Sequence, residues 1–367
     1  MKRYILLTPG PTPLPPSVSQ AMAQPILHHR TKEFGALFEY TLEQMKYVFR
    51  TQASTVLMCT TSGTGMMESA VANLLSPGDK ALVHATGAFG DRFVKILRSY
   101  GLSPVVVSET WGHAADPEKL RRALKDNPGL KAVFFQHTDT STGVLNALEP
   151  LARAVRELQP EALVVVDAVS GLAAERLETD AWGLDVVLTG SQKGLMGAPG
   201  LGFAAVGQRA WARVEEAKLP RFYFDWRSMR KSLDKKETPY TPAVTLVAGQ
   251  AEALKLIRAE GIENVWARTS RLAGYTRAWA AKVGLQLFAR DPAAILTALK
   301  LPEGVDGDAL IKDILREEGI SIAGGQLQLK GKIIRIAHMG FISQADLDAG
   351  FAALEKRLAP SGAVRSA

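Results

Sequence analysis

The chain has 367 residues, of which 47% are hydrophobic and 22% are charged, and its formal net charge is +7. This composition is that of an ordinary globular protein, long enough for one large and one smaller domain. Lysines and arginines are spread along the sequence, which argues against nucleic-acid binding, while the basic excess suits small anionic substrates.

Three further patterns exclude other classes of protein. Cys59 is the only cysteine, so the chain has neither a disulfide framework nor a multi-cysteine zinc site. The six histidines are scattered, and we expect no bound metal. No apolar run approaches the ~18 residues of a membrane span, and the N-terminal run Tyr4–Leu7 is too short for a signal peptide. We therefore expect a cytoplasmic protein that binds no membrane.

The N-terminal segment is rich in proline. Five prolines surround Gly10 within residues 5–16, and this composition keeps a backbone extended. Two interpretations remain open at this point. The segment is a rigid arm, or Gly10 allows its backbone to approach a ligand closely.

A cationic cluster follows the arm. His29 and Arg30 stand just before a helix that we expect over Lys32–Arg50. Positive charge at a helix start opposes the helix macrodipole, so an anionic group should lie nearby. Either Glu33 or an anionic group of the substrate could fill that role.

The next elements form a possible anion site. A strand over Thr55–Cys59 leads into the turn Ser62–Gly65 and then a helix over Met66–Leu75. The free amides and the dipole of a helix N-terminus both favour an anion in such a turn. An ordinary helix cap with glycine at the bend is the alternative.

Two further strands end in residues suited to a ligand. Phe89 lies between glycines after a strand over Lys80–His84, where it can stack on a planar ring or simply pack in the loop. The strand Lys131–Gln136 ends in the polar run His137–Gly143. Turn formation explains part of this polarity, and a polar ligand would explain its density better.

The centre of the chain carries the strongest candidate residues. Two β-branched runs, Leu163–Val166 and Val186–Thr189, predict parallel strands joined by a helix over Leu172–Trp182. Asp167 ends the first strand, and Lys193 follows the second. Because ligands bind at the carboxyl ends of parallel strands, both side chains should face one crevice. A carboxylate and an amine are the two groups that a pyridoxal phosphate enzyme must supply; a helix cap and a solvated loop lysine are the alternatives.

Strands and helices alternate as far as residue 206, which predicts a mostly parallel sheet covered on both faces. The segment Pro220–Pro242 shows no periodicity and is long for a loop, and a helix over Val244–Ala259 should link the domains. The later pattern is α+β. We therefore expect an N-terminal arm at 1–16, a large domain at 17–243, a linker helix at 244–265, a small domain at 266–360 and a flexible tail at 361–367.

Taken together, the strings TPGPT, HRTKEF, SGTG, TSTG, VVVDAVS, GSQKG and PYTPAV resemble those of the class V aminotransferases, a family of fold-type I pyridoxal phosphate enzymes. Each string is weakly specific, but their order and spacing are strongly specific, and they cover essentially the whole chain. The resemblance implies an α/β fold with a mostly parallel seven-stranded sheet and a smaller C-terminal α+β domain. It also implies a homodimer with active sites at the subunit interface.

The resemblance also implies roles for individual residues. The residue matching Lys193 forms a Schiff base with pyridoxal 5′-phosphate, the one matching Asp167 binds the pyridine nitrogen, and the one matching Arg335 binds the substrate α-carboxylate. Tryptophan is commoner than phenylalanine at the stacking position of glyoxylate-using relatives. The other implied cofactor contacts are Ser62, Gly63 and Thr64 to the phosphate, Phe89 on the ring, Thr140 to the phenolic oxygen, Val169, Gln192 beside the lysine, and Thr241 across the dimer interface. The further candidates for substrate binding are Gly10, His29 and Arg30.

We expect amino transfer from alanine or serine to glyoxylate or pyruvate. Phosphoserine with 2-oxoglutarate is the second candidate, because His29 and Arg30 resemble a string with substrate-phosphate contacts. PYTPAV departs from that branch's pattern. Cysteine desulfuration requires a mobile cysteine, and Cys59 falls in an expected buried strand. A non-catalytic or hydrogenase-associated cofactor-binding protein is the third alternative.

Overall fold

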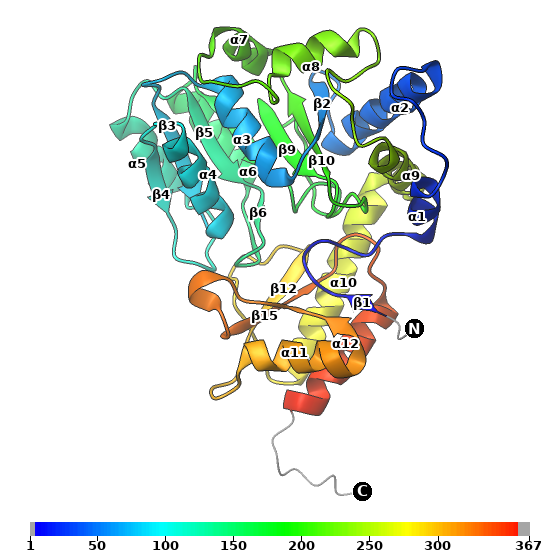
Figure 1. The fold of residues 1–367 in the computed structure, drawn as a ribbon. Helices are drawn as coiled ribbons and strands as arrows, with labels where there is room; N and C mark the ends of the chain where they lie inside the picture. The colour runs from blue at the N-terminus through cyan, green and yellow to red at the C-terminus, as the bar shows by residue number, and fades with distance from the viewer. Residues whose placement is uncertain (1–3, 359–367) are drawn as a thin grey trace, which may run out of the picture.

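The computed structural model describes residues 4–358, so the tail expected at 361–367 lies outside the described residues. Its centre is a seven-stranded sheet of order β2-β10-β9-β8-β5-β3-β4 (Figure 1). β10 runs antiparallel to both neighbours, and the other pairs are parallel. The strands are β2 (Thr55–Thr60), β3 (Ala81–Ala85), β4 (Val105–Ser108), β5 (Ala132–Gln136), β8 (Leu163–Asp167), β9 (Val186–Gly190) and β10 (Leu201–Val206).

Helices cover both faces of this sheet, because alternate strand residues are apolar on each side. Val164 and Val166 point into one core and Leu163 and Val165 into the other. The first core is closed by α2 (Lys32–Phe49), α5 (Pro117–Asp126), α6 (Leu148–Leu158) and α9 (Val244–Glu260). The second core is closed by α3 (Gly63–Leu74), α4 (Ala88–Ser99), α7 (Gln208–Glu216) and α8 (Trp226–Leu233).

The C-terminal part forms an antiparallel sheet of order β11-β12-β15-β14. The arm joins this part, since β1 (Ile5–Leu6) pairs in parallel with β13 (Ile320–Ser321). The remaining elements are α1 (Pro16–Met22), β6 (Thr138–Asp139), β7 (Val144–Leu145), α10 (Ile262–Lys282), β11 (Gln286–Leu287), β12 (Leu296–Lys300), α11 (Gly307–Glu318), β14 (Ala323–Gly324), the 3₁₀ turn Leu327–Leu329, β15 (Ile333–Ala337) and α12 (Gln344–Leu358).

These features confirm the expected fold class: a mostly parallel seven-stranded sheet with a smaller C-terminal α+β part. The residue boundaries of the domains remain our proposal. α9 ends at Glu260 and α10 begins at Ile262, with Gly261 between them, and Figure 1 shows α10 running from the large sheet toward the small one. Over residues 4–358, no helix combines the length and the apolar character that a membrane crossing requires.

The sequence prediction was wrong in two connections. The helix expected over Leu172–Trp182 is absent, and this segment folds as successive turns. Its polar side chains bind partners elsewhere in the fold instead. Glu178 forms an ion pair with Arg50, and Asp180 accepts a hydrogen bond from the hydroxyl of Thr51 at 2.6 Å. Local periodicity cannot reveal such partners, because they lie more than a hundred residues away in the sequence.

The second error concerns Pro220–Pro242, which contains α8. Asp225 caps this helix by accepting from the amide of Arg227. The buried indole of Trp226 donates to the hydroxyl of Ser69 at 3.2 Å. An anchoring side chain, rather than a long apolar stripe, therefore holds this short helix against α3.

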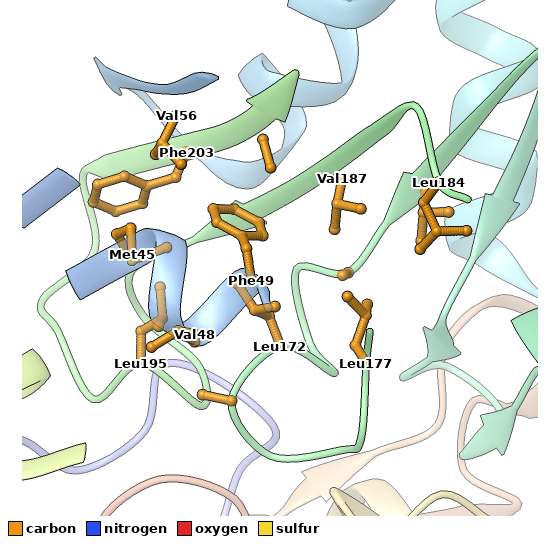
Figure 2. Close-up of a cluster of buried hydrophobic side chains, with 14 of the residues drawn as sticks. Met45, Val48, Phe49, Val56, Leu172, Leu177, Leu184, Val187, Leu195 and Phe203 are labelled. Atoms are coloured by element: carbon orange, nitrogen blue, oxygen red, sulfur yellow. The ribbon is translucent and has the colours of Figure 1, made fainter. Parts of the chain in front are cut away.

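Phe49 tests the first core. Its side chain is fully buried and lies among Met45, Leu172 and Phe203 (Figure 2). Phe49→Ala should lower the free energy of unfolding by ~3–5 kcal/mol, because it removes apolar contacts and leaves a cavity. Denaturant unfolding followed by circular dichroism measures this change. Lys46→Ala, on the exposed side of the same helix, should change it by less than about 1 kcal/mol; equal effects would contradict this packing.

Candidate active site

A cavity of about 350 Å³ opens at the carboxyl ends of the strands of the large sheet. Nine of the residues singled out in the sequence line it: Gly10, Ser62, Gly63, Thr64, Phe89, Asp167, Val169, Gln192 and Lys193. They come from the arm, the starts of two helices and the ends of two strands. Six further lining residues were not singled out: Pro11, Met67, Arg92, Ser170, Pro199 and Gln326.

Lys193 lies in the loop between β9 and β10 and points toward the arm. Its amine donates to the carbonyl of Pro9, and the backbone of Thr12 is tied to the same loop through the carbonyl of Gln192 at 3.1 Å. Gly10 has φ +125°, and a Cβ placed there would lie 2.4 Å from the lysine Cε. Glycine is therefore required at this position. Burial, followed by the charge of Arg335, lowers the pKa of Lys193 to about 8.

Asp167 ends β8 and accepts from the amide of Val169 at 2.8 Å. Burial raises the pKa of its carboxyl to about 6. Within residues 4–358 it forms no ion pair at contact distance, and Lys193 affects it only as a more distant charge. A buried carboxylate without a cationic partner, in a cavity wall, is suited to a ligand that brings positive charge.

The N-terminus of α3 also lines the cavity. The Ser62 side chain accepts from the amide of Gly65, which leaves earlier first-turn amides without helical partners. A Cβ at Gly63 would lie 2.7 Å from Val169, so this turn packs directly against the end of β8. The hydroxyl of Thr64 accepts from Arg92 at 2.8 Å. The turn is therefore an anion-binding cup with an arginine beside it.

Phe89 stands in the first turn of α4. Its amide donates to the buried carboxylate of Asp139 at 3.1 Å, and the guanidinium of Arg92 lies 4.5 Å from the ring centroid. Gly87 permits this arrangement, since a Cβ there would lie 2.6 Å from Asp139. Asp139 therefore fixes the aromatic residue in position, although it attracted attention in the sequence only as part of a polar run.

Arg335 comes from β15 of the small sheet and is only 5% exposed. Its guanidinium donates to the carbonyls of Thr140 and Gly324, at 2.6 and 2.8 Å. Burial lowers its pKa to about 10, and it forms no ion pair with any described carboxylate. Neither Arg335 nor Thr140 is among the residues that line the cavity, but Arg335 is close enough for its charge to lower the pKa of Lys193.

The remaining three candidates lie elsewhere in this chain. Arg30 pairs with Glu237 at 2.8 Å and donates to the carbonyl of Thr238. Thr241 lies 3.4 Å from the ring of His29. None of the three lines the cavity that holds Lys193. Glu237 is therefore the anion that pairs with the cationic cluster within this chain. Contact of His29 and Arg30 with a substrate remains a prediction.

The family profile described as aminotransferase class-V matches residues 4–342 of the chain. The protein belongs to the class V aminotransferase family. It is accordingly a pyridoxal 5′-phosphate-dependent aminotransferase, which confirms the family, the enzyme class and the cofactor expected from the sequence.

Individual relatives extend over nearly the whole chain. The soluble hydrogenase 42 kDa subunit of Anabaena cylindrica is 40% identical, over 96% of this chain and 92% of its own length. The serine–glyoxylate aminotransferase of Methylorubrum extorquens is 36% identical, over 98% and 92%. The solved structure of an alanine–glyoxylate aminotransferase from Nostoc sp. has a TM-score of 0.93 and 32% identity, over 97% and 95%.

The residues of the cavity fit this cofactor. The α3 N-terminus offers amides for a phosphate, Asp167 offers a carboxylate for the ring nitrogen, and Lys193 offers an amine for the aldehyde. The buried Oε1 of Gln192 has no hydrogen-bond partner among the described residues, so it is available to a bound group. These roles remain predictions for the individual side chains.

The lowered pKa of Lys193 predicts how covalent attachment depends on pH. Only the neutral amine reacts with an aldehyde, so the rate of attachment of pyridoxal 5′-phosphate should rise with pH and level off above about 8. An ordinary lysine would level off above ~10.4. Visible absorbance after mixing cofactor with the cofactor-free protein measures the rate, and Lys193→Ala should give no covalent signal. A midpoint near that of free lysine would contradict the assignment.

Proposed function

We propose that the protein transfers the amino group of alanine or serine to glyoxylate or pyruvate. The observation that carries this proposal is Arg335, a buried guanidinium that forms no ion pair within residues 4–358 and lies close enough to Lys193 for its charge to affect the amine. A guanidinium presents a planar fork that matches a carboxylate. Amino acids and 2-oxo acids share an α-carboxylate next to the carbon that reacts.

Each charged residue then has a separate task. Arg335 binds the carboxylate of either substrate and so orients the α-carbon. Lys193, with its pKa lowered to about 8, removes the proton from that carbon and can return it at physiological pH. Asp167 holds the ring nitrogen of the cofactor. Pyridoxal phosphate, when bound, supplies an electron-withdrawing ring that makes the α-proton acidic.

The names of relatives support glyoxylate as the acceptor and leave the donor open. Besides the serine–glyoxylate enzyme, an L-aspartate–glyoxylate aminotransferase from Paracoccus denitrificans is 34% identical over 97% of the chain. We favour a small neutral donor, because the lining includes Pro11, Pro199 and the neutral amide of Gln326. A hydrogenase-associated, non-catalytic protein would not require Lys193, Asp167 and Arg335 together.

The structure does not favour the other two reactions. Arg30, which suggested phosphoserine, pairs with Glu237 at 2.8 Å and would have to leave this carboxylate to bind a substrate phosphate. Cys59, which desulfuration would need as a mobile nucleophile, lies buried in β2. Burial raises the pKa of its thiol to about 11, so it is a poor nucleophile at neutral pH.

We also propose a cytoplasmic homodimer. Phe222 is 80% exposed, and its ring contacts Tyr240, next to Thr241 in the chain. Ile26 is also strongly exposed. The exposed ring of Tyr223 also contacts Tyr240, so these aromatic groups are contiguous. Contiguous exposed apolar surface often marks a protein interface, and an interface here would place Thr241 at a neighbouring subunit's cavity.

Arg335→Lys tests the carboxylate role. The variant should raise KM for every amino donor by about 10- to 100-fold, because lysine cannot form the fork and a charged hydrogen bond contributes ~1.5–3 kcal/mol. The assay pairs alanine, serine, aspartate and phosphoserine with glyoxylate, pyruvate and 2-oxoglutarate. Arg316→Lys is the control, because Arg316 forms an exposed ion pair with Asp313 on α11. Unchanged KM values would remove Arg335 from the site, and a preference for aspartate or phosphoserine would refute the proposed donors.

Phe222→Arg tests the dimer. Placing a charge in an apolar interface should shift the protein from the dimer to the monomer mass in light scattering. Leu315→Arg, at a partly exposed position of α11, should leave the mass unchanged. A wild-type protein with the mass of a monomer would refute the dimer itself.

A further inference from the structure

Arg92 is the second cationic side chain in the wall of the cavity, after Lys193. It belongs to the first turns of α4, whereas its hydrogen-bond partner Thr64 begins α3. The guanidinium also lies over the ring of Phe89, 4.5 Å from its centroid. One side chain therefore connects the anion-binding cup to the aromatic wall.

Most of the hydrogen-bond donors of Arg92 are unused within the described residues. A guanidinium carries five N–H donors, and one bond, from Nη1 to Thr64, is found in the described part of the chain. No described carboxylate forms an ion pair with it. A cation held in a cavity wall, with most of its donors unused, is suited to an anionic ligand.

The position of Arg92 distinguishes it from Arg335. Arg335 comes from the small sheet and is the charge that most lowers the pKa of Lys193, while Arg92 is the weaker influence on that amine. Arg92 is instead bonded to the first turn of α3, where free amides favour a phosphate. The two guanidinium groups are therefore placed for different anions: Arg335 for the substrate carboxylate, and Arg92 for the phosphate end of the cofactor.

The geometry points to Arg92 as a positioning residue for the cofactor. It holds the Thr64 hydroxyl and the Phe89 ring in place, and its charge selects the phosphorylated form of pyridoxal. This inference rests on the proposed placement of the phosphate at the N-terminus of α3. It adds to that placement the residue that balances the phosphate charge.

The experiment compares two probes on the full-length protein, after hydroxylamine has displaced the bound cofactor from Lys193 and dialysis has removed it. Pyridoxal 5′-phosphate and pyridoxal, which lacks the phosphate, are titrated into each variant, and absorbance gives their dissociation constants. Arg92→Gln should raise the constant for pyridoxal 5′-phosphate by about 10- to 100-fold, as expected when a charged hydrogen-bonding partner is lost. The constant for pyridoxal should change less than about 3-fold.

Two controls separate charge selection from packing. Arg98→Gln removes the same charge from the last turn of α4 and should change neither constant. Phe89→Leu removes the ring and should weaken both probes equally. If Arg92→Gln also weakens both equally, Arg92 has only a structural role and the inference is wrong. If Arg92→Gln changes only KM for amino acids, Arg92 contacts substrate and the inference is wrong as well.

Circular dichroism checks that each variant folds. If the glutamine variant does not fold, Arg92→Lys tests the inference instead, because it keeps the charge and loses the hydrogen-bond geometry. This variant should retain a clear preference for pyridoxal 5′-phosphate over pyridoxal, and the preference should fall as salt is added. Loss of that preference without a salt effect would overturn the inference. A wild-type protein that binds both probes equally well would refute the placement of the phosphate at the N-terminus of α3. That result differs from a failure of the inference about Arg92 alone.

Discussion

An amine and a carboxylate lie buried in one cavity of this protein without forming a contact pair. Burial disfavours the charged form of each, so the pKa of Lys193 falls to about 8 and that of Asp167 rises to about 6. A direct ion pair would relieve both shifts and would also occupy the two groups that the chemistry needs. The fold prevents it by holding Asp167 at the end of β8 and Lys193 in the loop between β9 and β10.

The contacts that position these two groups come from both the large and the small sheet. The arm reaches Lys193 through Pro9 and Gly10, and the same arm pairs with the small sheet through Ile5 and Leu6. Arg335 reaches across from β15 to the carbonyl of Thr140 in the large domain. Arg335 and Lys193 are therefore held in place by contacts that join the two sheets.

Two charged residues outside the reactive pair shape the site as well. Asp139 accepts from the first turn of α4 and so fixes Phe89, and Arg92 joins α4 to α3. Both residues bond to residues that we propose as cofactor contacts, Phe89 and Thr64, and neither has a local signature. This explains why an aromatic residue and a phosphate turn can be recognised in a sequence while the groups that orient them are missed.

The sequence by itself determined the sheet, most helices and the core of the site. Strand ends can be read from the β-branched apolar runs, and parallel strands bring Asp167 and Lys193 to one edge of the sheet. It could not reveal that Arg30 pairs with Glu237, that residues 172–182 form turns, or that Arg92 bonds Thr64. Those outcomes depend on contacts between distant segments, and such contacts exist only once the chain has packed.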